Sequence, residues 1–386
     1  PHLNPFALTT TPNFLEQVTT MGLEIGQNIE GDKGMYQIVQ PLKGSTVFKA
    51  EIIEGDFASD RWSVPAAAHH FKPVADFNPR AVVKTALTYS EKKNLQQEYD
   101  FHKNLSRELS PHIRSLRDTV KGQDPEAAPL CLVFEWMERA MGRLIRGGPE
   151  FLKNPSLLRA ISKSTLLVLE AMESSNPEHI GLFLVPFKYK SLRKLEIRPT
   201  KILLSNIDTD KPIAKLTNLL RPSNSEGVDS GCQRPTYRAP EVWRGLPCTH
   251  VSHVWSLGVM LANSLCTYHL FCDRNHLGKH NAGRNEWCIA RLFRLVGPIM
   301  DPVSHSYAKE FKYGRKLSVY CDEHGRLYLP LSNWRQELEK VNDAQSDDCY
   351  ISKTVLDFIQ SLLVVTPEMR STAKEALALD YFLKKD

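Results

Sequence analysis

The first strong pattern along the chain is an alternation of apolar and polar residues between residues 36 and 54. Residues 36–39 alternate weakly, a break with Pro41 and Gly44 follows, and residues 46–54 continue the alternation. The apolar members of the second stretch are Val47, Phe48, Ala50 and Ile52. A period of two residues is typical of strands with one buried face, so the pattern predicts a β-hairpin.

Apolar runs and helical spacing predict the elements that come next. After an insert at about residues 55–79, residues 81–86 predict a short strand, and residues 130–135 predict a buried strand. Residues 91–105 predict a helix, because Leu95, Tyr99 and His102 recur at helical spacing.

From residue 156 onward the pattern is helical. Helices are predicted at residues 156–173, 254–265, 286–295, 352–364 and 372–379. A strand-rich first part followed by a helix-rich second part predicts an α+β fold with two lobes. Residues 1–35 show no sustained period and predict an extension that is poorly ordered or draped over the rest.

Composition limits the class of protein. With 386 residues, 42% of them hydrophobic and 24% charged, the chain has the composition of an ordinary globular protein and the length for two or three folding units. Its longest apolar stretches, such as residues 180–187, are far shorter than the roughly 18 residues of a membrane span. The formal net charge of +5 is too small to indicate a dedicated nucleic-acid binder.

The 8 cysteines include no CxxC pair, which favours free thiols and an intracellular, reducing compartment. The Cys and His residues between Cys266 and His280 lack the paired spacing of structural zinc sites, so we expect no metal there. The chain starts without Met and shows no secretory signal pattern. Cytoplasm or nucleus is therefore expected, and an organelle matrix stays open if a targeting peptide has been removed.

Three segments carry the most specific pattern: residues 237–243 (YRAPEVW), 253–259 (HVWSLGV) and 367–373 (PEMRSTA). In order and spacing they resemble the A-P-E, D-x-W-S-x-G and P-x-x-R-x-T-A segments of eukaryotic protein kinases, with local similarity to divergent relatives of the SR-protein kinases. The resemblance implies the bilobal kinase-like fold. A strand-rich N-lobe would span residues 36–137, and a helical C-lobe would span residues 138–386.

The resemblance implies that parts of this fold are retained. Glu241 and Arg370 occupy the places of a carboxylate and a guanidinium that pair to hold the activation segment on the helical lobe. Lys84 occupies the place of the ATP-binding lysine, with Glu98 of the next helix as its partner.

The phosphate loop departs from the kinase pattern. The places of its three glycines fall on Gln40, Leu42 and Ser45, and Gly44 is out of register. Side chains there keep the backbone away from a pyrophosphate, because the missing Cβ of glycine is what permits close approach. Together with a hinge at Glu135 and Met137, these residues imply a weak ATP site at most.

The catalytic positions depart further. Glu196 stands in the place of the catalytic Asp, Lys201 in the place of the metal-binding Asn, and Asn218 in the place of the metal-chelating Asp. An ammonium group repels Mg²⁺, and an amide lacks the charge that this cation prefers, so we expect no metal. Leu220 replaces the mobile glycine of D-F-G, and His253 replaces the Asp of D-x-W-S-x-G. Asp208 and Asp210 lie in a predicted polar turn rather than at a relocated metal site.

These observations favour a catalytically inactive kinase-like protein, a pseudokinase, that serves as a binding scaffold or as a structural subunit of a complex. One alternative is a weak or atypical ATP-dependent phosphotransferase that uses Lys84, Glu98 and Glu196. Another is a component of a ribonucleoprotein, which would use residues 1–35, 55–79 and 177–193 as contacts. Residues 187–194 interleave aromatic and basic side chains as RNA-binding surfaces do, but solvated Lys and Arg on a loop are the commoner explanation of such a run.

Overall fold

The computed structural model describes most of the chain. The described residues are 22–57, 62–64, 79–122, 130–145, 154–173, 196–218, 233–266, 270–271, 283–303, 305–329, 331–343 and 350–383. They form two compact units: Pro1–Gln96 with Asp118–Val133, and Gln97–Arg117 with Phe134–Asp386. Several predicted features lie outside the described residues, namely Leu220, the segment 177–193, most of the insert at 55–79 and the His residues of the stretch that follows Cys266.

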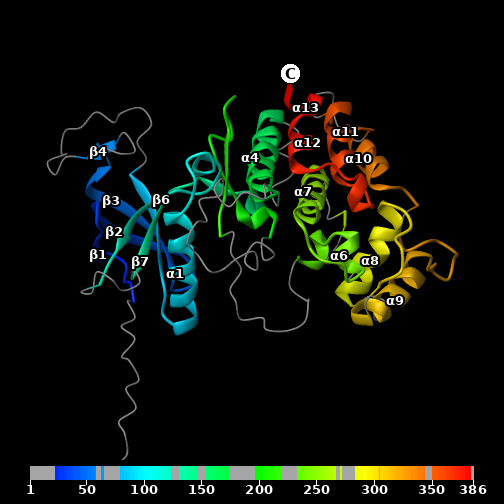
Figure 1. Cartoon of the computed structure of the whole chain (residues 1–386), viewed down its shortest axis with the longest axis horizontal. Coiled ribbons are helices and arrows are strands. Elements are labelled where there is room, and N and C mark those ends of the chain that lie inside the picture. The colour runs from blue at the N-terminus through cyan, green and yellow to red at the C-terminus, as the bar shows by residue number, and fades with distance from the viewer. Residues whose placement is uncertain are drawn as a thin grey trace, which may run out of the picture. The chain divides into compact units, whose positions relative to one another are not determined.

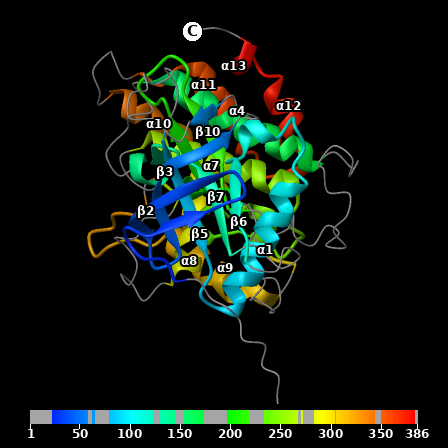
Figure 2. The ribbon, with the colours of Figure 1, turned by 90° about the vertical axis from the view of Figure 1, so that its left-hand side faces the viewer.

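The first unit is built on a twisted sheet whose strand order is β1-β2-β3-β5-β7-β6, with β4 paired to the edge of β3. Figure 2 shows β2, β3, β5, β6 and β7 side by side. The strands are β1 Asn28–Glu30, β2 Gly34–Lys43, β3 Val47–Phe57, β4 Trp62–Val64, β5 Arg80–Thr85, β6 Leu116–Val120 and β7 Cys131–Glu135. Helix α1, Tyr89–Lys103, follows β5 in the chain.

The predicted hairpin is confirmed, since β2 pairs with β3 in antiparallel register. The expected break at Pro41 is wrong, because β2 continues to Lys43. Register shifts between Ile38 and Gln40 and between Pro41 and Lys43 accommodate the proline, which has no N–H for the ladder. The turn then falls at Gly44, which adopts a left-handed φ of 54° that glycine takes at no steric cost.

The start of the chain contributes more to this sheet than its pattern suggests. In the described part of the expected extension, β1 pairs with β2 and Ile29 is buried. The turn after β1 is held by the buried Asp118 carboxylate, which accepts hydrogen bonds from the Lys33 amide at 3.0 Å and the Tyr36 hydroxyl at 2.8 Å. These hydrogen bonds hold the turn between β1 and β2 in place, although the apolar pattern of residues 28–35 is too weak to predict a strand there.

The boundary between the units differs from the expected division after residue 137. Residues Gln97–Arg117 group with the second unit, and the later boundary lies between Val133 and Phe134. The physical reason is apolar burial, because Leu109 and Ile113 are buried in the core of the second unit. A sequence pattern that identifies a helix does not say which core its far end joins.

The second unit is mainly helical (Figure 1). Its longer helices are α4 Pro155–Glu173, α7 His250–Leu265, α8 Arg284–Leu295, α9 Ala308–Ser318, α10 Trp334–Asp343 and α11 Lys353–Leu362. The short ones are α2 Met141–Leu144, α6 Pro240–Trp243, α12 Ala373–Leu377 and α13 Asp380–Leu383, and 3₁₀ turns lie at Ser110–His112, Pro199–Lys201, Pro235–Tyr237, His305–Tyr307 and Pro367–Met369. The fold is therefore α+β, as predicted from the order of strands and helices.

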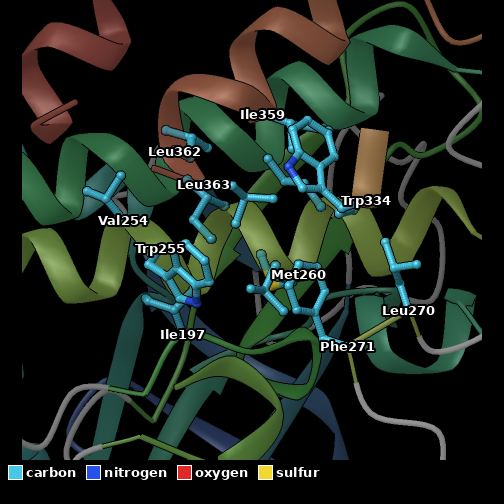
Figure 3. Packing of buried hydrophobic residues seen from close by; sticks show 14 of the residues in the cluster. Ile197, Val254, Trp255, Met260, Leu270, Phe271, Trp334, Ile359, Leu362 and Leu363 are labelled. Atoms are coloured by element: carbon cyan, nitrogen blue, oxygen red, sulfur yellow. The ribbon is translucent and has the colours of Figure 1, made fainter. Parts of the chain in front are cut away.

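Helix α7 forms the centre of this unit, and its residues Ser252–Leu265 are all buried. Figure 3 shows Trp255 and Met260 of α7 packed with Leu362 and Leu363 from the end of α11. Gly258 permits this contact, since an added Cβ would lie 2.8 Å from Leu363 Cδ2. Such burial on every face explains why the apolar residues of this helix are not confined to one stripe.

A second, small sheet lies within this unit, in the strand order β10-β9-β8. Its strands are β8 Arg139–Ala140, β9 Ile202–Ser205 and β10 Ile213–Leu216. The turn between β9 and β10 carries the exposed Asp208 and Asp210, and the Asn154 amide holds it by donating to the Ile207 carbonyl at 2.7 Å. The two aspartates thus lie in a solvated turn.

None of the described helices is both long and apolar enough to cross a lipid bilayer. The expectation of free thiols holds for Cys131, Cys266, Cys288 and Cys321. It is wrong for Cys248, which is disulfide-bonded. Spacing alone does not reveal such a bond, because the fold decides which cysteines meet.

Candidate functional site

The candidate site begins where the chain enters the small sheet of the second unit. Ile197 is 1% exposed and packs in the large core, which fixes the position of the preceding Glu196. The 3₁₀ turn Pro199–Lys201 follows, and β9 then pairs with β10 so that Ile202 lies opposite Leu216. This pairing brings the residues before β9 close to those after β10.

Glu196 is buried, with 5% of its surface exposed, and both of its carboxylate oxygens face arginines. Arg234 Nε donates to Oε1 at 2.7 Å, and Arg198 Nε lies 2.9 Å from Oε2. Partial burial lowers the pKa of Arg198, and the Glu196 charge opposes that shift. Glu196 is thus the centre of an ion-paired group that links residues 38 positions apart.

Lys201 and Asn218 are joined directly. The Lys201 ammonium donates a hydrogen bond to the backbone carbonyl of Asn218, and the Thr217 amide donates to the Lys201 carbonyl at 2.9 Å. Asn218 is exposed and has a left-handed φ of 49°, a conformation that asparagine adopts more readily than most residues. The positive charge of Lys201 is therefore held at the end of β10.

Glu135, at the end of β7, takes part in a second ion-paired group. Lys215 Nζ donates to both carboxylate oxygens, at 2.7 and 2.8 Å, and the Ser115 amide donates to Oε1 at 2.6 Å. The backbone carbonyl of Glu135 accepts two hydrogen bonds from Arg114, at 3.0 and 2.9 Å. Burial lowers the pKa of Arg114 to about 10, and the charges of Glu135 and Glu98 act against this shift.

The structure brings Glu241 and Arg370 together. Arg370 Nη1 and Nη2 donate to the two oxygens of Glu241 at 2.8 and 2.9 Å, and the arginine side chain is fully buried. Ser252 of α7 donates to the same carboxylate at 2.8 Å. Arg370 also bonds the Val251 and Val364 carbonyls, so one guanidinium connects α6, the start of α7 and the end of α11.

His253 is 2% exposed in the first turns of α7. Its Nε2 lies 3.9 Å from Cys248 Sγ, and within the described residues its Nδ1 has no hydrogen-bond partner. Burial lowers the pKa of His253 to about 4, the charge of His250 lowers it further, and the Glu241 carboxylate acts in the opposite direction. The imidazole is therefore neutral at pH 7.

Comparison with known proteins adds to this geometry. A family model described as a protein kinase domain matches residues 203–382. Among curated proteins, the chain is 23% identical over 282 residues to cyclin-dependent kinase C-2 C of Arabidopsis thaliana, covering 71% of this chain and 36% of the relative. It is 27% identical over 154 residues to a serine/threonine protein kinase of Aspergillus fumigatus, covering 39% and 35%. It is 26% identical over 159 residues to the dual specificity protein kinase lkh1 of Schizosaccharomyces pombe, covering 38% and 20%.

The chain has a protein-kinase-like fold. It spans about a third of the length of the first two relatives. The matched segment includes most of β9, all of β10, and the residues Asn218, Glu241 and Arg370. The similarity to SR-protein-kinase relatives stays a prediction.

The kinase-like positions do not fit a magnesium ion. Mg²⁺ takes oxygen ligands in octahedral geometry, mostly carboxylates and water. At the two ligand positions the structure has an ammonium and an amide, and the ammonium is bonded to the main chain of the amide residue. In the part of the chain that the structure describes, no group of three or more His, Cys, Asp and Glu side chains is placed to hold a metal ion.

The remaining predicted residues are distributed over both units. Lys84 lies on β5 in the first unit, opposite Val47 of β3, whereas Glu98 lies on α1 in the second unit. Their pairing stays a prediction. Met137 is buried at the hinge position, and its sulfur accepts a hydrogen bond from Ser205 at 3.7 Å.

Sequence reasoning missed the groups that surround the predicted residues. Arg198 and Lys215 stand only two and three positions from Glu196 and Asn218, so their spacing was a usable signal. Arg114 and Arg234 come from distant segments, and no local pattern marks them. Gln233 was also missed, although its amide bonds the Ser252 carbonyl and the Ala239 amide and so anchors α6 to α7.

Proposed function

We propose that this chain is a kinase-like protein without phosphoryl-transfer activity and that it acts as a binding scaffold or as a structural subunit of a complex. The observation that carries the proposal is the pairing of Glu196 with Arg198 and Arg234. A general base must come within about 2.6–3.2 Å of the proton that it removes. Each oxygen of this buried carboxylate already faces an arginine, so Glu196 would have to give up an ion pair to accept a substrate proton.

The electrostatics of the same region support the proposal. Phosphoryl transfer depends on positioning and on cations held by carboxylates, and it involves little covalent chemistry by the protein. Here the two metal-ligand positions supply Lys201 and Asn218, which offer no carboxylate. Losing the carboxylate charge at position 218 and adding a cation at position 201 removes the main source of transition-state stabilisation.

The scaffold itself is intact, which supports a binding role. The Glu241–Arg370 pair is fully hydrogen-bonded, and the apolar core around α7 is continuous. We infer that the surface of this intact fold binds a protein partner or a multisubunit complex in an intracellular compartment. The disulfide at Cys248 is the observation least expected of a reducing compartment.

The main alternative is an atypical ATP-dependent phosphotransferase in which Lys84, Glu98 and Glu196 act. The relatives named above are all kinases, which favours this alternative. Within this alternative, Glu196 would have to leave its two arginines to reach a substrate hydroxyl. A ribonucleoprotein component is the third interpretation, and its suggested RNA segment at residues 187–194 lies outside the described residues.

A phosphate-transfer assay distinguishes the first two. The purified chain is incubated with γ-labelled ATP, Mg²⁺ or Mn²⁺, and generic protein and peptide acceptors, beside its Lys84→Met and Glu196→Gln variants and the exposed control Lys43→Met. We expect no transfer above background in any of them. Transfer that Lys84→Met abolishes, that Glu196→Gln greatly reduces and that Lys43→Met leaves unchanged would overturn the proposal.

A native purification tests the binding role. The tagged chain, isolated under native conditions, is expected to retain partners in stoichiometric amounts, and these should survive nuclease treatment. Loss of the partners on nuclease treatment would favour the ribonucleoprotein interpretation. Recovery of the chain as a free monomer would contradict both.

A further inference from the structure

Helix α9 presents to solvent a face that combines positive charge with an aromatic ring. The exposed side chains of Lys309, Lys312, Tyr313 and Lys316 recur at helical spacing, so they share one side of the helix. These four residues are the basic face of α9. Between Lys309 and Lys316 the helix rises by about 10 Å, so three ammonium groups stand along one short line.

The opposite side of α9 fixes the helix on α8. Phe311, Gly314 and Leu317 are buried, and an added Cβ at Gly314 would lie 2.7 Å from Ile289 Cγ2. The ring of Phe311 meets that of Phe293 edge to face, with centroids 6.2 Å apart. Figure 1 shows α8 and α9 side by side. Close packing therefore holds the basic face in place, and a pre-organised surface loses less entropy when a partner binds.

The carboxylates near the basic face are engaged elsewhere. Before and after α9, each acid lies against a basic side chain, in the pairs Asp301–Arg315, Asp322–Arg326 and Glu323–His324. Glu310, the acid of α9 itself, is half-buried and stands about two turns before the buried Leu317, on the packed side. Within the described residues, the three ammonium groups of the basic face have no hydrogen bond or ion pair. Their charge is therefore uncompensated.

Aromatic and apolar side chains continue this surface past the end of α9. Tyr313 is 62% exposed, Val319 is 64% exposed and Tyr320 is 52% exposed. Tyr320 stacks on Tyr328, with ring centroids 5.3 Å apart. Among the described residues, half of the exposed large hydrophobic side chains lie between residues 300 and 331. Exposed apolar clusters mark interaction sites, and tyrosine is enriched in protein interfaces.

We propose that the basic face of α9, together with Tyr320, docks an acidic segment of a protein partner that carries one aromatic or large aliphatic side chain. Carboxylates of the segment pair with the lysines, and its apolar side chain packs on Tyr313. The inference rests on the proposed binding role and adds a surface and a partner chemistry to it. Charge complementarity selects the occupant, because ammonium groups without counter-charges attract carboxylates and repel basic segments.

A protein segment fits this surface better than RNA does. Single-stranded nucleic acid stacks its bases on free aromatic faces. Here Tyr320 and Tyr328 cover one face of each other, at an interplanar angle of 26°. The formal net charge of +5 is also small for a nucleic-acid-binding chain. An apolar protein side chain needs only van der Waals contact with the rings, and the exposed Val319 adds to that contact.

Selection from a random peptide library tests the partner chemistry directly. The full chain and its Lys312→Glu/Lys316→Glu double variant are each immobilised and panned against the same phage-displayed library. We expect the wild type to enrich peptides rich in Asp and Glu around one Trp, Phe, Tyr or Leu, and the double variant to enrich none of them. Enrichment of basic or neutral peptides, the same peptides on both proteins, or no enrichment on the wild type would each overturn the inference.

Titration of a synthetic copy of the most enriched peptide measures each group. Lys312→Glu/Lys316→Glu should weaken binding at least about tenfold, and Lys312→Gln/Lys316→Gln by a smaller factor. The control Lys353→Glu/Lys374→Glu makes the same change in net charge at two exposed lysines of the second unit and should leave the affinity unchanged. Tyr313→Ala should weaken binding without altering its dependence on salt, because the ring carries no charge. Melting temperatures show whether each variant folds, and an equal loss in the control would contradict a specific site on α9.

Two further arms separate this inference from the alternatives. Labelled oligouridylate that binds the wild type but not Lys312→Glu/Lys316→Glu would assign the face to RNA and overturn the proposal. In the native purification, the double variant should lose a partner whose acidic segment cross-links to α9 in the wild type. Retention of every partner by the double variant would overturn this inference and leave the proposed binding role standing. A wild-type chain recovered as a free monomer would instead contradict the proposed function.

Discussion

The Lys201 ammonium and the Asn218 backbone carbonyl, 17 residues apart in the chain, are joined by a hydrogen bond. In the kinase pattern these two positions carry Asn and Asp and face a metal ion together. Here the side chain at the first position contacts the main chain at the second.

Breaking the buried pair between Glu241 and Arg370 should destabilise the second unit strongly. Glu241→Gln leaves the fully buried guanidinium without its counter-charge, and the expected loss in unfolding free energy is about 3–5 kcal/mol. Urea denaturation followed by tryptophan fluorescence measures it. The control is Glu339→Gln, which breaks an exposed pair with Arg335 and should cost no more than about 0.5 kcal/mol. Equal effects of the two variants would contradict the structural role.

Glu196 should behave as a structural residue and not as a catalytic one. Glu196→Gln removes the charge that Arg198 and Arg234 share, and it should lower the unfolding free energy by about 1–3 kcal/mol. Arg234→Met should lower the unfolding free energy by a smaller amount, because the Arg234 side chain is 44% exposed. The double variant should lose less than the sum of the two single variants. Additive losses in this cycle would show that the pair does not interact.

His253 should make the protein less stable in acid. The unfolded imidazole takes up its proton near the ordinary pKa of 6.5, whereas burial keeps the folded one neutral down to a pKa of about 4. Between these values the unfolded state binds more protons, so stability falls as the pH falls, by about 3 kcal/mol in all. His253→Gln should flatten the dependence of unfolding free energy on pH in this window. The exposed control His324→Gln should leave this dependence on pH unchanged. An unchanged slope in His253→Gln would refute the claim that His253 causes the loss of stability in acid.

The order of elements was predictable from the sequence because burial leaves a regular signal. The predicted strand at 81–86 corresponds to β5, and the predicted helices at 156–173 and 286–295 correspond to α4 and α8 within one or two residues. Helix α9 was missed because Gly314 interrupts its pattern. Glycine weakens a helix, but here an added Cβ would lie 2.7 Å from Ile289 Cγ2, so close packing on α8 requires it.

The candidate site was predictable in its positions but not in its contacts. The resemblance of residues 197–204 and 215–220 to kinase segments assigned places to Glu196, Lys201 and Asn218, and the structure describes all three in the second unit. Their partners were not predictable, because Arg234 and Arg114 reach the site through tertiary folding and no local period marks them. The bond between Lys201 and Asn218 depends on the β9–β10 register, which only the folded chain sets.

The most direct test of this account is a crystal structure of the chain with ATP and Mn²⁺, because the anomalous signal of manganese locates the metal without ambiguity. We predict no manganese within coordination distance, about 2.5 Å, of the Asn218 side chain, and an ammonium from Lys201 against the Asn218 carbonyl. An ordered manganese ion that bridges Asn218 to the phosphates beside Glu196 would contradict it.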